Sequence, residues 1–148
     1  MKYKLIALGA IKNGPEKVLL DSYLKRLTLD FSIQEIVPKK AMSKEDEGVL
    51  ILSHLQPSDF VIVLDEKGED LSTRAFSDMI ENRISREAKT CVFVIGGADG
   101  LGENIKKRSQ LKISFSRMTW PHMLVRALLV EQLYRCQQIK NNHPYHRD

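Results

Sequence analysis

Two continuous apolar runs constrain the fold of this chain most: residues 60–64 (FVIVL) and 91–95 (CVFVI). Both have the length of a strand and are rich in β-branched residues, and neither alternates with polar positions. Such strands are covered on both faces, as in the middle of a parallel sheet. The runs therefore predict a central sheet enclosed between two layers.

Helical and strand patterns alternate through the rest of the chain. Polar and apolar residues alternate over 2–8 and 31–37, and a short strand pattern spans 111–115. Helices are expected at about 15–27, 43–55, 72–84, 103–109 and 119–139, where Ser43, Ser72 and Thr119 provide start signals. This order predicts an α/β fold with a mostly parallel sheet flanked by helices, in a single domain over residues 1–148.

Composition excludes several classes of protein. No apolar run approaches the roughly 20 residues that span a bilayer, and the N-terminal strand lacks the features of a signal peptide. Cys91 and Cys136 stand alone in apolar runs, without a metal-ligand spacing. We expect two buried, reduced thiols in a cytoplasmic protein with no membrane segment and no metal site.

Positive charge is concentrated in the last third of the sequence. The net charge is +4, yet residues 1–100 hold 14 basic and 16 acidic side chains, whereas residues 101–148 hold 9 basic and 3 acidic ones. Clustered cations favour a polyanionic partner such as RNA, although a solvated surface gives the same pattern.

Ligands of parallel sheets bind beyond the carboxyl ends of the strands, which here means after Leu64, Ile95 and Phe115. Residues 96–102 (GGADGLG) hold four glycines but match neither a dinucleotide fingerprint nor a P-loop. Asp99 would also repel a pyrophosphate. The loop suits a neutral or cationic nucleoside such as one with a sulfonium, or it is a strand-to-helix turn without a ligand.

Three features near the C-terminus each have two interpretations. Trp120 covers a ligand ring or seals the core, and Thr119 caps a helix or contacts a ligand through its neighbouring backbone. Arg126 lies in a helix that is apolar nearly all round, so an acid elsewhere in a dimer or a substrate anion must pair with it. The polar tail, residues 142–148, is frayed or supplies Tyr, His and Arg to an RNA site.

Taken together, these segments resemble the bacterial ribosomal RNA large subunit methyltransferase H family. The resemblance spans the chain and rests on LDEKG (64–68), FVIGGADGL (93–101), SFSRMTWPH (114–122), LVR (124–126), EQLYR (131–135) and PYHR (144–147). It implies methylation of N3 of a pseudouridine in 23S ribosomal RNA, in the ribosome or its large subunit, with S-adenosyl-L-methionine as cofactor. It further implies a homodimer and a deep C-terminal trefoil knot.

The resemblance also implies roles for individual residues. Those implied to bind the cofactor are Leu64, Gly96, Phe115, Ser116, Arg117, Met118, Thr119 and Trp120. Those implied to act on the RNA are Arg126, His146 and Arg147 as catalytic groups and His122 and Tyr145 as substrate contacts, with the tail of one subunit completing the site of the other. Because N3 carries a proton, His146 is the expected base and Arg126 or Arg147 the stabilising cation.

Two other function classes fit parts of the sequence. One is a small nucleotide-binding enzyme of Rossmann type, against which the missing phosphate motifs count. The other is a non-catalytic RNA-binding module, which predicts salt-sensitive RNA binding and no affinity for a cofactor.

Overall fold

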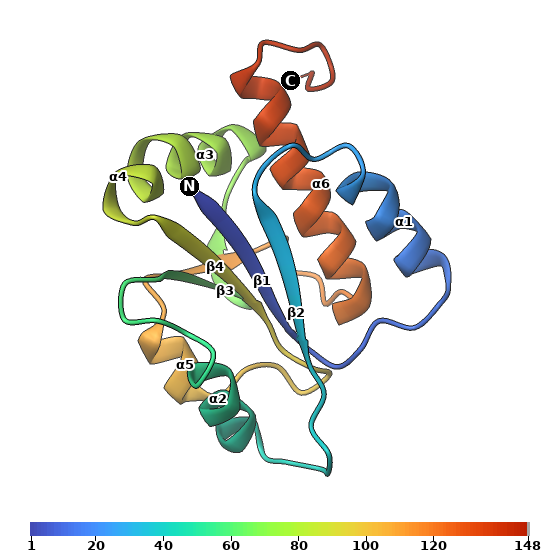
Figure 1. Cartoon of the computed structure of the whole chain (residues 1–148), viewed down its shortest axis with the longest axis vertical. Coiled ribbons are helices and arrows are strands. Elements are labelled where there is room, and N and C mark those ends of the chain that lie inside the picture. The colour runs from blue at the N-terminus through green and yellow to red at the C-terminus, as the bar shows by residue number, and fades with distance from the viewer. Residues whose placement is uncertain (148) are drawn as a thin grey trace.

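The computed structural model describes residues 1–147 and shows one five-stranded sheet with helices on both faces (Figure 1). The strands are β1 (Lys2–Leu8), β2 (Phe31–Ile36), β3 (Phe60–Asp70), β4 (Thr90–Ile95) and β5 (Leu111–Ser114). Their order is β2-β1-β4-β3-β5, and all pairings between them are parallel. The α/β architecture expected from the sequence is confirmed.

The helices form two layers. They are α1 (Pro15–Leu24), α2 (Lys44–Leu52), α3 (Thr73–Asp78), the π-helical segment η1 (Met79–Ile84), α4 (Ser85–Glu87), α5 (Glu103–Arg108) and α6 (His122–Lys140). Helices α1, α3 and α6 lie on one face of the sheet, and α2 and α5 lie on the other (Figure 1).

Alternate side chains of the central strands fill these two cores. In β4, Phe93 packs in the cluster that holds Leu129 and Leu133 of α6, whereas Val92 and Val94 pack in the cluster of α2 and α5. Successive side chains of a strand point to opposite faces, so a run that is apolar at every position needs a helical layer on each side. Both free cysteines are buried, as expected, and burial raises the pKa of Cys136 to about 12.

Helix starts match the sequence signals at two of the three expected caps. The hydroxyl oxygens of Ser43 and Ser72 each accept a backbone N–H three residues on, at 3.1 Å. The segment after Ser72 differs from a plain α-helix, because it widens to a π-helix over η1. Phe76, Ile80 and Ile84 are all buried. Residues that are four positions apart lie closer to one face of a π-helix than of an α-helix, because the π-helix has more residues in each turn.

Strand β3 is longer than the predicted strand, which ended at Leu64. Its pairing with β5 breaks between Leu64 and Glu69 and then resumes, so residues 65–68 form an irregularity within the strand. A Cβ on Gly68 would lie only 2.6 Å from the carbonyl carbon of Ile113. This close approach of two backbones requires glycine. The apolar pattern stops before the strand does because Glu66, Lys67, Glu69 and Asp70 are exposed.

Candidate functional site

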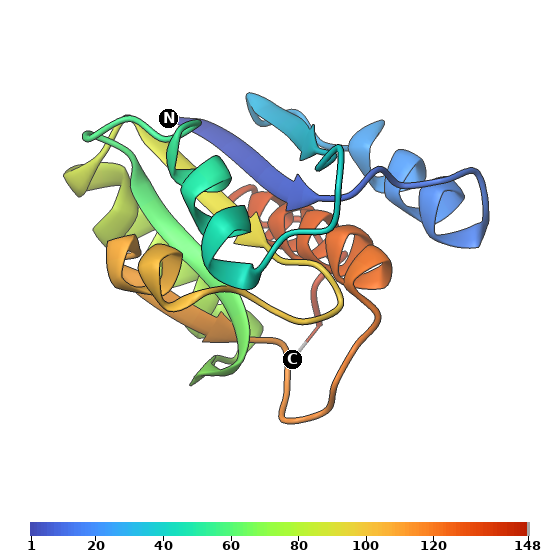
Figure 2. The same cartoon turned by 90° about the horizontal axis from the view of Figure 1, so that it is seen from below.

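The irregular part of β3 at residues 64–67 and the loops after β4 and β5 meet at one cavity of about 410 Å³. Because β4, β3 and β5 are neighbours in the sheet, their carboxyl ends lie along the same edge. Figure 2 shows the connections after β4 and β5 leaving the sheet at this edge. The lining residues come from β3, from the ends of β4 and β5 and the loops after them, and from α2, α5 and α6: Lys44, residues 64–67, residues 95–101, Lys106, residues 113–116, Met118, Thr119, Trp120, His122 and Val125.

The glycines after β4 serve two different needs. A Cβ on Gly96 would lie 2.8 Å from the carbonyl oxygen of Gly100, and Gly100 has a φ of +79°, so the turn itself requires both. A Cβ on Gly97, in contrast, would have no other heavy atom within 4 Å. The backbone at Gly97 therefore faces open space on the cavity wall, where a ligand can approach closely.

The loop after β5 is held in a strained shape by serine hydroxyls. Ser116 has a φ of +134°, which non-glycine residues rarely adopt. Its hydroxyl oxygen accepts the N–H of Met118 at 3.1 Å and the indole Nε1–H of Trp120 at 3.0 Å. Ser114 donates its hydroxyl to the Ser116 carbonyl from the strand end. Strain of this kind costs about 1–3 kcal/mol and is concentrated at ligand sites.

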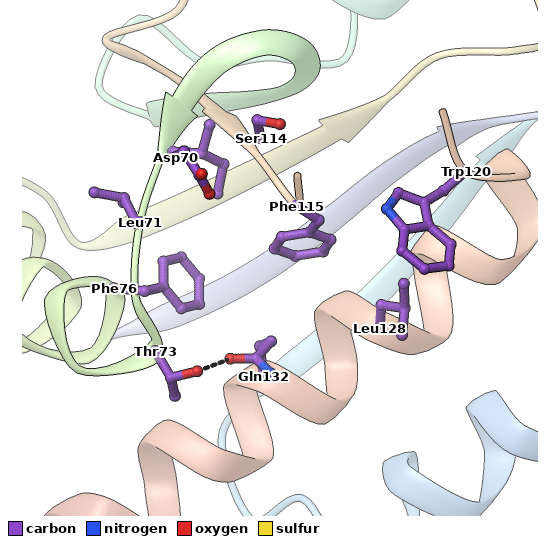
Figure 3. A pocket seen from close by; sticks show the side chains of 10 residues that line it. Asp70, Leu71, Thr73, Phe76, Ser114, Phe115, Trp120, Leu128 and Gln132 are labelled. Carbon is purple, nitrogen blue, oxygen red and sulfur yellow. Dashed lines mark hydrogen bonds between the residues drawn. The ribbon is translucent and has the colours of Figure 1, made fainter. Parts of the chain in front are cut away.

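Trp120 does not seal the core. Its side chain is 41% exposed, and it lines both the main cavity and a second one of about 290 Å³. Figure 3 shows the indole facing this second cavity, across from Phe115 and Phe76 and beside Leu128 of α6. The core interpretation is wrong, because the Ser116 hydrogen bond holds the ring at the surface of the sheet edge.

Acidic residues surround the main cavity on the β3 side. Asp65 forms an ion pair with Lys106 at 2.6 Å. Burial alone would raise the pKa of Asp65, but the Lys106 ammonium and the Lys67 backbone N–H together lower it. Glu66 accepts the hydroxyl of Thr119 at 2.9 Å. Thr119 therefore ties two loops together and does not cap α6, which begins at His122 without a side-chain cap.

Arg126 is fully buried and paired within its own chain. Its guanidinium donates to Glu35 of β2 at 3.1 Å and to the carbonyl oxygens of Leu8 and Gly9 at 2.7 and 2.9 Å. Neither a substrate anion nor a second subunit is needed to satisfy its charge. Arg126 does not line the cavity, and it fixes the first turn of α6 against the end of β1.

His122 lies one helical turn before Arg126 and lines the cavity. Burial lowers the pKa of His122, and the nearby Arg126 charge lowers it further. At neutral pH the imidazole is therefore uncharged and has one nitrogen that can accept a proton.

The C-terminal tail packs on the C-terminal half of α6. Tyr145 donates its hydroxyl to Glu131 at 3.1 Å and meets the ring of Tyr134 edge-on, at 4.8 Å between centroids. Arg135 lies over the Tyr145 ring at 4.8 Å and has an Nη1 3.4 Å from His146 Nδ1. Figure 1 shows this tail at the end of α6 opposite to the 115–121 connection.

The structure thus brings together most of the residues implied as cofactor contacts. Those on the cavity wall are Leu64, Gly96, Phe115, Ser116, Met118, Thr119 and Trp120, together with His122. Arg117 is exposed and is not among the lining residues, and Tyr145, His146 and Arg147 are not either.

Sequence reasoning missed the contributions of Lys44 and Lys106. Lys44 opens α2, and Lys106 lies in α5, so no local pattern links either residue to the strand ends. Asp65 and Glu66 carried a signal, because they directly follow a buried strand.

Two kinds of feature are absent from the part of the chain that the structure describes. Within residues 1–147, no three His, Cys, Asp or Glu side chains are grouped so that they could hold a metal ion. No helix in this range is both long and apolar enough to cross a membrane.

Comparison with known proteins agrees with this geometry. A family model described as a predicted SPOUT methyltransferase matches residues 1–146. Relatives named Ribosomal RNA large subunit methyltransferase H are 39% identical in Rhodospirillum centenum, 41% in Rhodospirillum rubrum and 42% in Flavobacterium psychrophilum. Each match covers 99% of this chain and 99% of the relative. The chain therefore belongs to the SPOUT methyltransferase family, within its ribosomal RNA large subunit methyltransferase H group.

Proposed function

We propose that this enzyme transfers a methyl group from S-adenosyl-L-methionine to N3 of a pseudouridine in 23S ribosomal RNA, in the cytoplasm. The observation that supports the proposal most is the convergence on one cavity of residues 64–67 of β3 and the loops after β4 and β5. The names of the relatives supply the class of RNA. The cofactor, when bound, supplies a methyl group that its sulfonium has already activated.

The residues on the cavity wall fit such a cofactor. Phe115, Met118 and Trp120 offer apolar surface to an adenine ring, and the backbone at Gly97 is open to close approach. The carboxylates of Glu66 and Asp99 suit a cationic ligand and disfavour a pyrophosphate. Leu64, Gly96 and residues 115–120 would hold the cofactor, with Arg117 next to the cavity.

The tail residues do not line the cavity of their own chain, which favours a second subunit if they act on the RNA. Tyr145 and His146 contact Glu131 and Arg135 in the C-terminal half of α6 in their own chain. Glu131 and Arg135 lie nine and thirteen residues after His122, which is about 14 and 20 Å of helix. We therefore propose a homodimer in which Tyr145, His146 and Arg147 complete the partner's site. Arg126 serves by positioning the start of α6.

The proposal includes a single domain with a C-terminal trefoil knot, as the family resemblance implies. Strand β5 is at the edge of the sheet, and α6 then crosses to contact both α3 and α1 on one face. The loop after β5 is tied to the β3 loop by the Thr119–Glu66 hydrogen bond. A chain threaded through the 65–70 region is compatible with these contacts.

Trp120 offers a direct test of cofactor binding, because it is the only tryptophan and lines the cavity. We expect S-adenosylhomocysteine to change its fluorescence in a saturable manner, and NAD to have no effect. A Trp120→Phe variant should lose the signal while calorimetry still detects binding. Absence of calorimetric binding at millimolar S-adenosylhomocysteine would reject the proposal.

Activity is tested with methyl-labelled cofactor and ribosomal particles that lack the modification. We expect label at N3 of one pseudouridine of 23S RNA. Labelled cofactor that binds without transfer to any large-subunit RNA would reject the RNA substrate while leaving the cofactor assignment intact.

A further inference from the structure

Methylation at N3 requires an acceptor for the proton that the neutral imide carries there. This inference rests on the proposed function and concerns which side chain receives that proton. The side chains on the cavity wall that accept protons near neutral pH or below are Asp65, Glu66, Asp99 and His122.

The three carboxylates are less suited than His122 to accept the N3 proton. Asp65 is held by Lys106 at 2.6 Å, and Glu66 already accepts the Thr119 hydroxyl. Asp99 is exposed on the outer turn between Gly97 and Gly100, which form an isolated bridge. A carboxylate is also a much weaker base than an imidazole at the pH of the cytoplasm.

The backbone at His122 is fixed in position by the segments on either side of it. It is the first residue of α6 and directly follows the strained 115–121 loop. One turn later, Arg126 is anchored to Glu35 and to the end of β1 by three hydrogen bonds. The backbone that carries the imidazole is thus held in place at the edge of the cavity, which helps to orient a proton-transfer group.

The surrounding charges keep the ring neutral. The charged groups that face the cavity with His122 are Lys44, Asp65, Glu66, Lys67, Asp99 and Lys106, with Arg126 behind it on α6. Asp65 and Lys106 neutralise each other, and Glu35 pairs with Arg126. Burial and the Arg126 charge both hold the pKa of His122 below its usual value, so the free base is the resting form.

We propose that the His122 imidazole is the catalytic base that removes the N3 proton of the target nucleotide. The N3–H bond breaks and its proton moves to the unprotonated ring nitrogen. The N3 electron pair forms the bond to the methyl carbon, and the carbon–sulfur electrons remain on the donor sulfur. The imidazolium then returns its proton to water, which the nearby Arg126 charge favours.

The test compares methyl transfer by wild type and His122→Asn over a range of pH. We expect the variant to lose about 10²–10⁴-fold in kcat at neutral pH. Its affinity for S-adenosylhomocysteine should stay within about twofold, since Asn keeps the size and polarity of the site. Its activity should rise with pH toward the wild-type value, because the imide of the substrate ionises unaided in alkaline solution.

The controls separate this role from others. His146→Asn should lower activity by a similar factor at every pH, and His54→Asn, at the end of α2, should leave the profile unchanged. Alkaline recovery in His146→Asn but not in His122→Asn would transfer the role to His146. A His122→Asn enzyme that is fully active, or equally impaired at all pH values with cofactor binding intact, would overturn the proposal.

Wild-type enzyme gives an independent measurement if the variant does not fold. Its kcat should fall on acidification with the same midpoint that NMR reports for His122 titration in the S-adenosylhomocysteine complex. Two different midpoints would overturn the proposal. Failure of the wild-type enzyme to bind cofactor or methylate RNA would instead contradict the proposed function.

Discussion

Arg126 shows how a single charged residue can organise a site that it does not enter. It is the largest fully buried side chain in the described range, and its guanidinium joins α6 to β1 and β2 through Glu35 and two carbonyl groups. Its Nε is the one buried side-chain nitrogen or oxygen within residues 1–147 that has no hydrogen-bond partner. A buried guanidinium is tolerated only with such partners, so loss of Glu35 would leave the Arg126 charge without its carboxylate.

Arg126→Ala should therefore lower the free energy of unfolding by about 2–5 kcal/mol, since it opens a cavity in the core and removes the donor to the Leu8 and Gly9 carbonyls, while Glu35 still accepts the Ile11 N–H. Urea denaturation followed by circular dichroism measures the change. Asp21→Ala is the matched control, because it removes an exposed ion pair with Lys17 and should cost less than about 1 kcal/mol. Equal losses in the two variants would contradict this account of Arg126.

At the scale of elements, the site depends on three loops that are each shaped by backbone contacts. Gly96 and Gly100 allow the turn after β4, and Ser116 with Ser114 holds the loop after β5. Gly68 allows β3 to press against β5, so the first loop is part of the sheet and not a separate excursion.

Gly68→Ala should separate β3 from β5, because its Cβ would lie 2.6–2.7 Å from the backbone of Ile113 and Lys112. We expect a loss of about 1–3 kcal/mol in unfolding free energy, as for other overpacked positions. Gly97→Ala is the control: it meets no atom within 4 Å and should change stability by less than about 0.5 kcal/mol. A Gly68→Ala protein as stable as the control would show that the strands can move apart at no cost.

At the scale of the whole molecule, much of the positive charge in the last third of the chain is used internally. Lys106, Arg126, Arg135 and Lys140 each pair with a carboxylate. The net charge of a segment therefore overstates the surface that it offers to RNA. The tail packs on the C-terminal half of α6 and does not line the cavity, which is why a composite site between subunits is proposed.

A mixing experiment tests that composite site. A Gly97→Leu chain should have a blocked cavity without a clash at its Cβ, and a Tyr145→Ala/His146→Ala chain should have a defective tail. Each variant alone should be inactive. If tails act in the partner's site, half of the randomly reassociated dimers are mixed and carry one intact site, so activity should return to about a quarter of wild type. No recovery in verified mixed dimers would place the tail in its own subunit's site.

Local patterns in the sequence determined a large part of the fold of this protein. The apolar runs at 60–64 and 91–95 required two covering layers, and the serines at 43 and 72 marked helix starts, because burial period and capping depend on neighbouring residues. The ends of β4 and β5 followed from the same patterns to within one residue, whereas β3 continues to Asp70, beyond the predicted end at Leu64. The family followed from the joint motifs.

Tertiary structure decided how the side chains were partnered. Arg126 meets Glu35 across 91 positions and Thr119 meets Glu66 across 53, pairings that depend on the strand order β2-β1-β4-β3-β5. The same packing placed His122 on the cavity wall and Tyr145 against Glu131 in the middle of α6. Contacts between distant segments arise from packing of whole elements, and no periodicity within a segment encodes them.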